Sequence, residues 1–215
     1  MKKAIIVAGG WDGHEPRQCA DIMKSLLEAE DYDVQLHEDM QVYTDVDAMS
    51  AFDLIVPIWT MGEISGEQWS GLSTAIHEGA GVAGFHGGMC DAFRQNTDYQ
   101  FMCGGQWVSH PDGIVEYTVN ITKADDPIVE GLSDFQMNSE QYYLHVDPCN
   151  EVLATTTFVN PESAPQVAGC VMPVVWKRHW GQGRVFYSSL GHVAADFDVP
   201  EAKEIQRRGM LWATR

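Results

Sequence analysis

Basic residues are scarce in this sequence. Its 215 residues include 13 lysines and arginines against 31 aspartates and glutamates, which gives a formal net charge of −18 at pH 7. Nucleic acids and anionic membrane surfaces attract positively charged proteins, so this balance argues against both as partners. It is typical instead of a solvated acidic surface. We therefore expect the partner to be a small molecule, while association of the chain with itself stays open.

Cysteines and long hydrophobic runs are also few. The five cysteines form no CxxC pair, so the sequence indicates neither a disulfide framework nor a thiolate zinc site. No apolar run reaches the length of a signal-peptide core or a membrane span. We predict a cytoplasmic protein with five free thiols. A GxGxxG motif after the first predicted strand is missing as well, which argues against a bound dinucleotide.

The residues that are present predict one α/β domain. Hydrophobic residues make up 45% of the chain, and a chain of this length can bury about 70% of its unfolded surface. Four apolar runs read as buried strands and alternate with segments of helical period: 3–8, 32–37, 53–59 and 81–85. We predict that residues 1–215 form a single domain with a doubly wound, mostly parallel sheet covered by helices on both faces.

Further elements are expected along the chain. Ser65-Gly66-Glu67-Gln68 is a capping box that starts a helix. Other helices are predicted from residue 17 and from about residue 198, and residues 46–52 are predicted to form a short helix or a turn. Strands are predicted over 114–122 and 151–158, and 171–179 with 184–190 reads as a hairpin. Residues 91–111 are predicted to be irregular, and residues 126–135 to form a turn and loop.

The stretch Gly81-Val82-Ala83-Gly84-Phe85-His86-Gly87-Gly88 gives the most specific prediction. Its first part is a small, apolar strand, and glycines beside His86 allow a sharp turn and close approach of other groups. A strand that ends in such a turn under a polar side chain has the geometry of a nucleophile elbow. We expect His86 to stand at the tip of this turn.

Other polar side chains follow predicted strands in the same way. His14 comes after the first strand and His192 after the last. Parallel strands deliver such residues to one edge of the sheet, where ligands of this architecture bind. We therefore expect His14, His86 and His192 to lie close together. Trp11, Trp59, Trp107 and Tyr142 stand near the same ends and could stack on a sugar ring, although core packing is the commoner fate of tryptophan.

Residues 173–192 read PVVWKRHWGQGRVFYSSLGH and resemble the closing signature of ThuA-like proteins, the trehalose utilisation family. Gly84-Phe85-His86-Gly87, Ser109-His110-Pro111 and Glu140-Gln141-Tyr142 also resemble motifs of that family, in the same order. The resemblance covers nearly the whole chain. It implies a flavodoxin-like fold, a three-layer sandwich akin to class I glutamine amidotransferases.

The same resemblance implies an active site and a substrate class. It adds His110 and Glu140 to the histidines above, so we predict His86, Glu140, His110 and His192 as catalytic residues. His14, Trp11, Trp59 and Tyr142 are predicted to bind the substrate, a trehalose-type disaccharide or its 3-keto derivative. The amidotransferase elbow carries cysteine where this chain has His86, and amide hydrolysis by that route needs a thiolate. We therefore do not expect a cysteine-dependent amidotransferase.

Two chemistries suit several imidazoles and a carboxylate. One is metal-free acid–base catalysis, because histidine titrates near neutral pH. The other uses a divalent metal ion, for which the candidate ligands are His14, His86, His110, His192 and Glu140. No HExxH or comparable spacing decides between them. An enzyme that isomerises, epimerises or cleaves a keto sugar is the leading hypothesis. A sugar-binding or regulatory module without turnover and a metal-dependent hydrolase are the alternatives.

Overall fold

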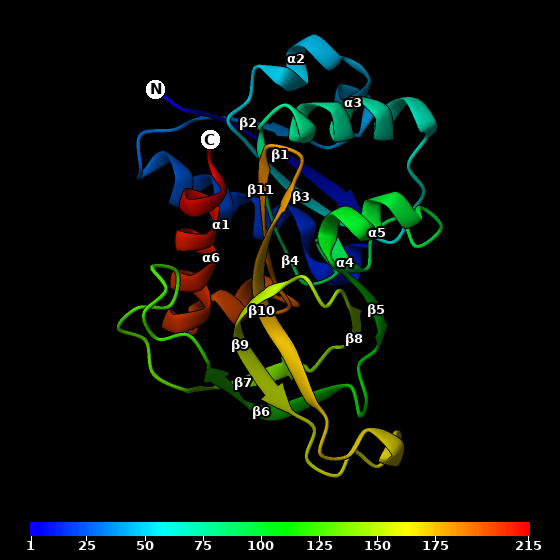
Figure 1. The fold of residues 1–215 in the computed structure, drawn as a ribbon, viewed down its shortest axis with the longest axis vertical. Helices are drawn as coiled ribbons and strands as arrows, with labels where there is room; N and C mark the ends of the chain where they lie inside the picture. Colours follow the sequence, from blue (N-terminus) through cyan, green and yellow to red (C-terminus); the bar gives the residue numbers. More distant parts are fainter.

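A nine-stranded sheet forms the centre of the molecule, in the computed structural model that describes residues 1–215 (Figure 1). The strand order is β2-β1-β3-β4-β11-β10-β9-β6-β7. The first five strands in this order are parallel: β2 Asp33–His37, β1 Lys3–Gly10, β3 Leu54–Thr60, β4 Gly81–Phe85 and β11 Gly183–Ser188. The other four each pair antiparallel to the strand before them: β10 Val171–Trp180, β9 Glu151–Thr157, β6 Ile114–Ile121 and β7 Phe135–Glu140.

The sheet is thus mixed, with a parallel half and an antiparallel half. The expected parallel strands are present, but they make up about half of the sheet and not most of it. The predicted hairpin supplies the change of direction, because β10 turns back at Gly181, where φ is +58°, and pairs antiparallel with β11. Strands β9, β6 and β7, which precede β10 in the chain, extend the sheet from β10 by further antiparallel pairing. A separate two-stranded sheet pairs β5 Gly105–Ser109 with β8 Tyr143–Val146.

Helices lie on both faces of the parallel half. Helices α1 Pro16–Glu28 and α6 Pro200–Ala213 cover one face, and α2 Val46–Ser50, α3 Gly66–His77, α4 Gly87–Cys90 and α5 Thr97–Cys103 lie on the other (Figure 1). The short 3₁₀ helices are η1 Asp12–His14, η2 Gln41–Thr44, η3 Pro165–Val167 and η4 Ala194–Asp198. None of the helices has the length and hydrophobicity that crossing a lipid bilayer requires.

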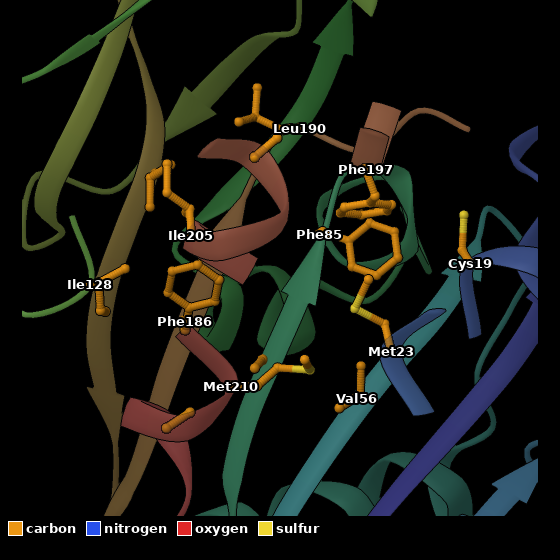
Figure 2. Packing of buried hydrophobic residues seen from close by; sticks show 14 of the residues in the cluster. Cys19, Met23, Val56, Phe85, Ile128, Phe186, Leu190, Phe197, Ile205 and Met210 are labelled. Atoms are coloured by element: carbon orange, nitrogen blue, oxygen red, sulfur yellow. The ribbon is translucent and has the colours of Figure 1, made fainter. Parts of the chain in front are cut away.

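The two faces bury two separate hydrophobic cores. Along β1, Ala4 and Ile6 belong to the core under α1 and α6, whereas Ile5 and Val7 belong to the core under α3. This alternation follows from the two-residue period of a strand. Figure 2 shows the first core, where the rings of Phe85 and Phe197 meet edge to face with centroids 5.2 Å apart. Because both faces of β1 are buried from Ala4 to Ala8, this part of the strand is apolar without interruption, as the sequence indicated.

Most predicted elements are confirmed within two residues. The strand predicted over 81–85 is β4, and the predicted capping box opens α3: Ser65 Oγ accepts a hydrogen bond from the Gln68 amide, and Gln68 Oε1 accepts one from the Ser65 amide. The prediction that residues 91–111 are irregular is wrong, because this segment contains α5 and β5. Asn96 caps the start of α5, and Gly104 ends the helix with φ +77°, directly before β5 begins at Gly105.

Candidate functional site

His86 stands at the tip of a sharp turn between β4 and α4. Its backbone has φ 47° and ψ −138°, a conformation that residues other than glycine rarely adopt. Two hydrogen bonds hold the turn: the His86 amide donates to the Ser188 carbonyl oxygen at 2.7 Å, and the Tyr187 hydroxyl donates to the His86 carbonyl oxygen at 3.0 Å. Backbone strain of this kind costs about 1–3 kcal/mol and is found mainly at functional sites.

Four histidine side chains converge on the carboxylate of Glu140. The Nε2 atoms of His86 and His14 lie 3.1 and 3.9 Å from its Oε2 atom. The Nε2 atoms of His110 and His192 each lie 3.6 Å from its Oε1 atom. The structure therefore brings together all five residues that were predicted either as catalytic or as metal ligands.

The strands explain this convergence. His14 follows β1, His86 follows β4 and His192 follows β11, so the carboxyl ends of three parallel strands deliver three of the histidines. Glu140 is the last residue of β7 in the antiparallel half, and His110 follows β5 of the small sheet. The site therefore lies where the parallel half meets the antiparallel half and the small sheet.

The inner histidine rings are oriented by their second nitrogen. His86 Nδ1 donates to the carbonyl oxygen of Ser189 at 2.9 Å, because a carbonyl oxygen can only accept. His14 Nδ1 lies 2.9 Å from the hydroxyl oxygen of Thr60. Glycine at position 87 makes room for His14, since a Cβ atom there would stand 2.7 Å from the ring. These contacts direct both Nε2 atoms toward Glu140.

Asp196 joins two of the loops that carry the site. Its Oδ2 atom accepts hydrogen bonds from the Ser139 hydroxyl at 2.6 Å and from the His192 amide at 2.9 Å. The carboxylate is buried, so these contacts hold the end of β7 in register with the loop after β11. Sequence reasoning missed Asp196 and Thr60, although Thr60 does follow the strand pattern as the last residue of β3.

The surroundings keep the side chain of Glu140 negatively charged and the side chain of His14 neutral. Burial alone would raise the pKa of Glu140, but the hydrogen bond with His86 and the charges of His86, His192 and His110 lower it to about 2. Burial, together with the charges of His86 and His192, lowers the pKa of His14 to about 3. Burial also lowers the pKa of His192. The 3.9 Å contact of His14 with Glu140 is therefore not an ion pair at neutral pH.

Comparison with known proteins identifies the family. A sequence model described as ThuA, trehalose utilisation, matches residues 3–213. The chain belongs to the ThuA family. No curated protein is significantly similar to it in sequence.

Solved structures share the ThuA fold at low sequence identity. A ThuA-like protein from Parabacteroides merdae is 20% identical, with a TM-score of 0.79 over 99% of this chain and 89% of that one. A cytoplasmic protein from Salmonella typhimurium is 12% identical, with a TM-score of 0.70 over 99% and 100% of the two chains. The glutaminase domain of CTPS from Trypanosoma brucei is 10% identical, with a TM-score of 0.57 over 99% and 93%.

This ThuA-family chain has no exposed thiol at the elbow. Cys90 lies four residues after His86 and is 1% exposed. Burial and the neighbouring Cys103 raise the pKa of the Cys90 thiol well above its ordinary value. Because the thiolate is the nucleophilic form of cysteine, a buried thiol of this kind is inert.

The aromatic residues predicted to bind substrate occupy different positions. Trp11 is 47% exposed and its ring meets His14 edge to face at 4.8 Å. Tyr142 is buried and stacks on the His86 ring at 3.9 Å, so it supports that histidine. Trp59 packs over Gly9, where a Cβ atom would stand 2.5 Å from its ring. Trp107 lies 5.8 Å from His110. Trp11 thus lies beside the inner histidine His14, and Trp107 lies beside the outer histidine His110.

Proposed function

We propose that this protein is a cytoplasmic enzyme of carbohydrate metabolism that transfers a proton next to the carbonyl group of a keto sugar. The observation that carries the proposal is the convergence of four imidazole Nε2 atoms on the buried carboxylate of Glu140. The family description, trehalose utilisation, supports trehalose-type disaccharides or their 3-keto derivatives as substrates. The similar cytoplasmic protein from Salmonella typhimurium supports the location.

The chemistry follows from the two sides of the carboxylate. The proton on the carbon next to a sugar carbonyl is acidic. When a positioned base removes this proton, an enediolate is left. Glu140, His110 and His192 are the candidates to take this proton and return it, because His110 is 38% exposed at its side chain, whereas His14 and His86 are buried behind the carboxylate. Return of the proton to a different carbon isomerises the sugar, and return to the opposite face of the same carbon epimerises it. Departure of a leaving group from the neighbouring carbon gives an elimination.

A polar cavity lined by the chain neighbours of Glu140 and His110 favours a substrate larger than one sugar ring. Its volume is about 550 Å³, and it is lined by side chains of β6, β7 and the loops around Pro111 and Pro161. Gln141 and Pro111 line it and are the immediate neighbours of Glu140 and His110 in the chain. The amide of Gln136 and the hydroxyl of Thr118 suit sugar hydroxyls as hydrogen-bond partners. The second ring of a disaccharide fits this chemistry.

The test compares turnover and binding in Glu140→Gln. We expect turnover of 3-keto-trehalose to fall by about 10²–10⁴-fold, the usual contribution of one acid–base group. The amide keeps the shape of the carboxylate, so the unfolding temperature and the affinity for trehalose should change little. Glu67→Gln on the exposed surface of α3 is the matched control and should retain full turnover.

Two outcomes would contradict the proposal. If the wild-type protein binds trehalose or its 3-keto derivative but turns over neither, the sugar-binding module is the better description. If Glu140→Gln unfolds the protein, the carboxylate has a structural role and the acid–base assignment is wrong.

A further inference from the structure

Three groups of the cluster form a compact set of potential metal ligands. One ligand atom each from His14, His86 and Glu140 lies within 4.8 Å of the other two, and all three residues are buried. A divalent ion about 2.0–2.2 Å from each of two ligand atoms, at a tetrahedral angle, separates them by about 3.4 Å. The observed Nε2 to Oε2 distances of 3.1 Å for His86 and 3.9 Å for His14 lie on either side of this value.

The hydrogen bonds behind the two rings match those of metal-binding histidines. Such residues commonly use one ring nitrogen for the ion and donate the other N–H to a carbonyl, a carboxylate or water, which fixes the tautomer. His86 does so through Nδ1 to the Ser189 carbonyl oxygen. His14 Nδ1 meets the Thr60 hydroxyl. In the metal-free protein His86 Nε2 and Glu140 Oε2 share a hydrogen bond at 3.1 Å. An ion bound here would displace the proton between them and contact all three groups at once.

We propose that His14, His86 and Glu140 bind one divalent transition-metal ion. Two imidazoles and one carboxylate are a ligand set of zinc sites that keep a coordination position open for substrate, whereas magnesium and calcium prefer oxygen ligands alone. The inference deepens the proposed function and rests on it for the role of the ion, since a bound divalent cation polarises a sugar carbonyl. The existence of the site rests on the three side chains.

The other two histidines then have a separate task. His110 and His192 contact Oε1, the carboxylate oxygen that faces away from His14 and His86 in the contact pattern. They remain available to exchange protons with the substrate. One carboxylate thus links an ion-binding side to a proton-transfer side.

The experiment measures metal binding without any substrate. Untagged full-length protein is stripped with a chelator, loaded with Zn²⁺ or Co²⁺, separated from free ion and analysed for metal content by mass spectrometry. We expect one ion per chain, a higher unfolding temperature after loading, and visible absorption from bound Co²⁺.

Variants assign the ion to these residues. His14→Ala and His86→Ala should each weaken Zn²⁺ binding by more than about 100-fold, because each removes a ligand. Thr60→Val removes only the contact behind His14 and should weaken binding by about 10–100-fold. His179→Ala, an exposed histidine on β10, should bind as the wild type does. Circular dichroism of each metal-free variant separates lost ligands from lost fold, and Thr60→Val decides the matter if His86→Ala does not fold.

The inference is overturned if the wild-type protein retains no stoichiometric metal, or if His14→Ala and Thr60→Val bind Zn²⁺ as tightly as the wild type. Turnover of 3-keto-trehalose at the full rate by the stripped protein would overturn the role of the ion in the reaction and would leave the proposed function intact. Stoichiometric metal binding without turnover of any keto sugar would have the opposite meaning: the site stands and the proposed function falls.

Discussion

Replacement of Gly87 by alanine tests how closely the site is packed. An ideal Cβ atom at this position lies 2.7 Å from Cε1 of His14, 2.8 Å from its Nδ1 and 2.9 Å from Cγ2 of Thr60. Ordinary contacts of a Cβ atom begin at 3.4 Å, so the His14 ring must withdraw by about 0.7 Å in a close-packed interior. Gly87 does not have a positive φ, so the change probes this contact and not backbone strain.

The expected cost is that of overpacking, about 1–3 kcal/mol. For a chain of this size each kcal/mol lowers the unfolding temperature by about 2–4 °C, so we expect a decrease of about 2–12 °C for Gly87→Ala. Thermal unfolding followed by circular dichroism measures it. Gly66→Ala is the matched control, because a Cβ atom there meets nothing within 4 Å and residue 66 begins α3. It should leave the unfolding temperature unchanged or slightly raised.

A double variant identifies the side chain whose clash with the new Cβ atom lowers the stability of Gly87→Ala. Removal of the His14 ring should relieve part of the clash, so the destabilisation by Gly87→Ala should be smaller in a His14→Ala background than in the wild type. The clash with Thr60 remains in both backgrounds. If Gly87→Ala unfolds at the wild-type temperature, or if its cost is the same in both backgrounds, the close approach of His14 to the elbow is not what requires glycine.

Three further predictions concern the supports of the fold and the site. Ser65→Ala removes the cap of α3 and should lower the free energy of unfolding by about 1 kcal/mol in urea titration, whereas Ser65→Asp should not. Asp196→Ala leaves the Ser139 hydroxyl and the His192 amide without their acceptor and should cost about 1–3 kcal/mol in the same assay; a wild-type midpoint would contradict this role. The hydrogen bond from Arg207 lowers the pKa of Glu204 to about 2, against about 4.3 in an unfolded chain. Its contribution is therefore present above pH 4.3 and lost as the pH falls to about 2. Because the side chain is 28% exposed, we expect Glu204→Gln to cost about 1 kcal/mol at pH 7 and to make the unfolding temperature less dependent on pH in the acid range; equal slopes for variant and wild type would refute it.

The sequence predicted the parallel half and its histidines well. Strands such as 81–85 are apolar on both faces and bounded by glycine, which makes their ends visible. Since parallel strands end at one edge, the positions of His14, His86 and His192 after strands sufficed to predict that they meet. His110 and Glu140 depended on family resemblance, because neither segment carries a local pattern that indicates a site.

The antiparallel half was harder to predict for a physical reason. Strand β7 reads FQMNSE, and its alternation is visible only when its pairing with β6 is known, because Asn, Ser and Glu are poor strand formers. The small sheet of β5 and β8 pairs residues that are 34–41 positions apart in the chain. Contacts behind the site, such as Asp196 with Ser139, depend on the packing of loops from both halves and leave no periodic signal.

The meeting of the two halves at the site has a consequence for the order of events during folding. His86 and Glu140 are 54 positions apart, and Glu15 accepts a hydrogen bond from the Ala194 amide 179 positions away. Contacts between residues so far apart in the chain require the closure of a long loop, which costs conformational entropy. We therefore expect them to form late in folding. A ribosome-bound or partly folded chain that has completed β1 to β4 holds only His14 and His86 of the cluster. A ligand that contacts Glu140 and the histidines can therefore bind only after the whole chain has folded. Such a ligand would stabilise the native state of the entire chain, from the first strand to the C-terminal part.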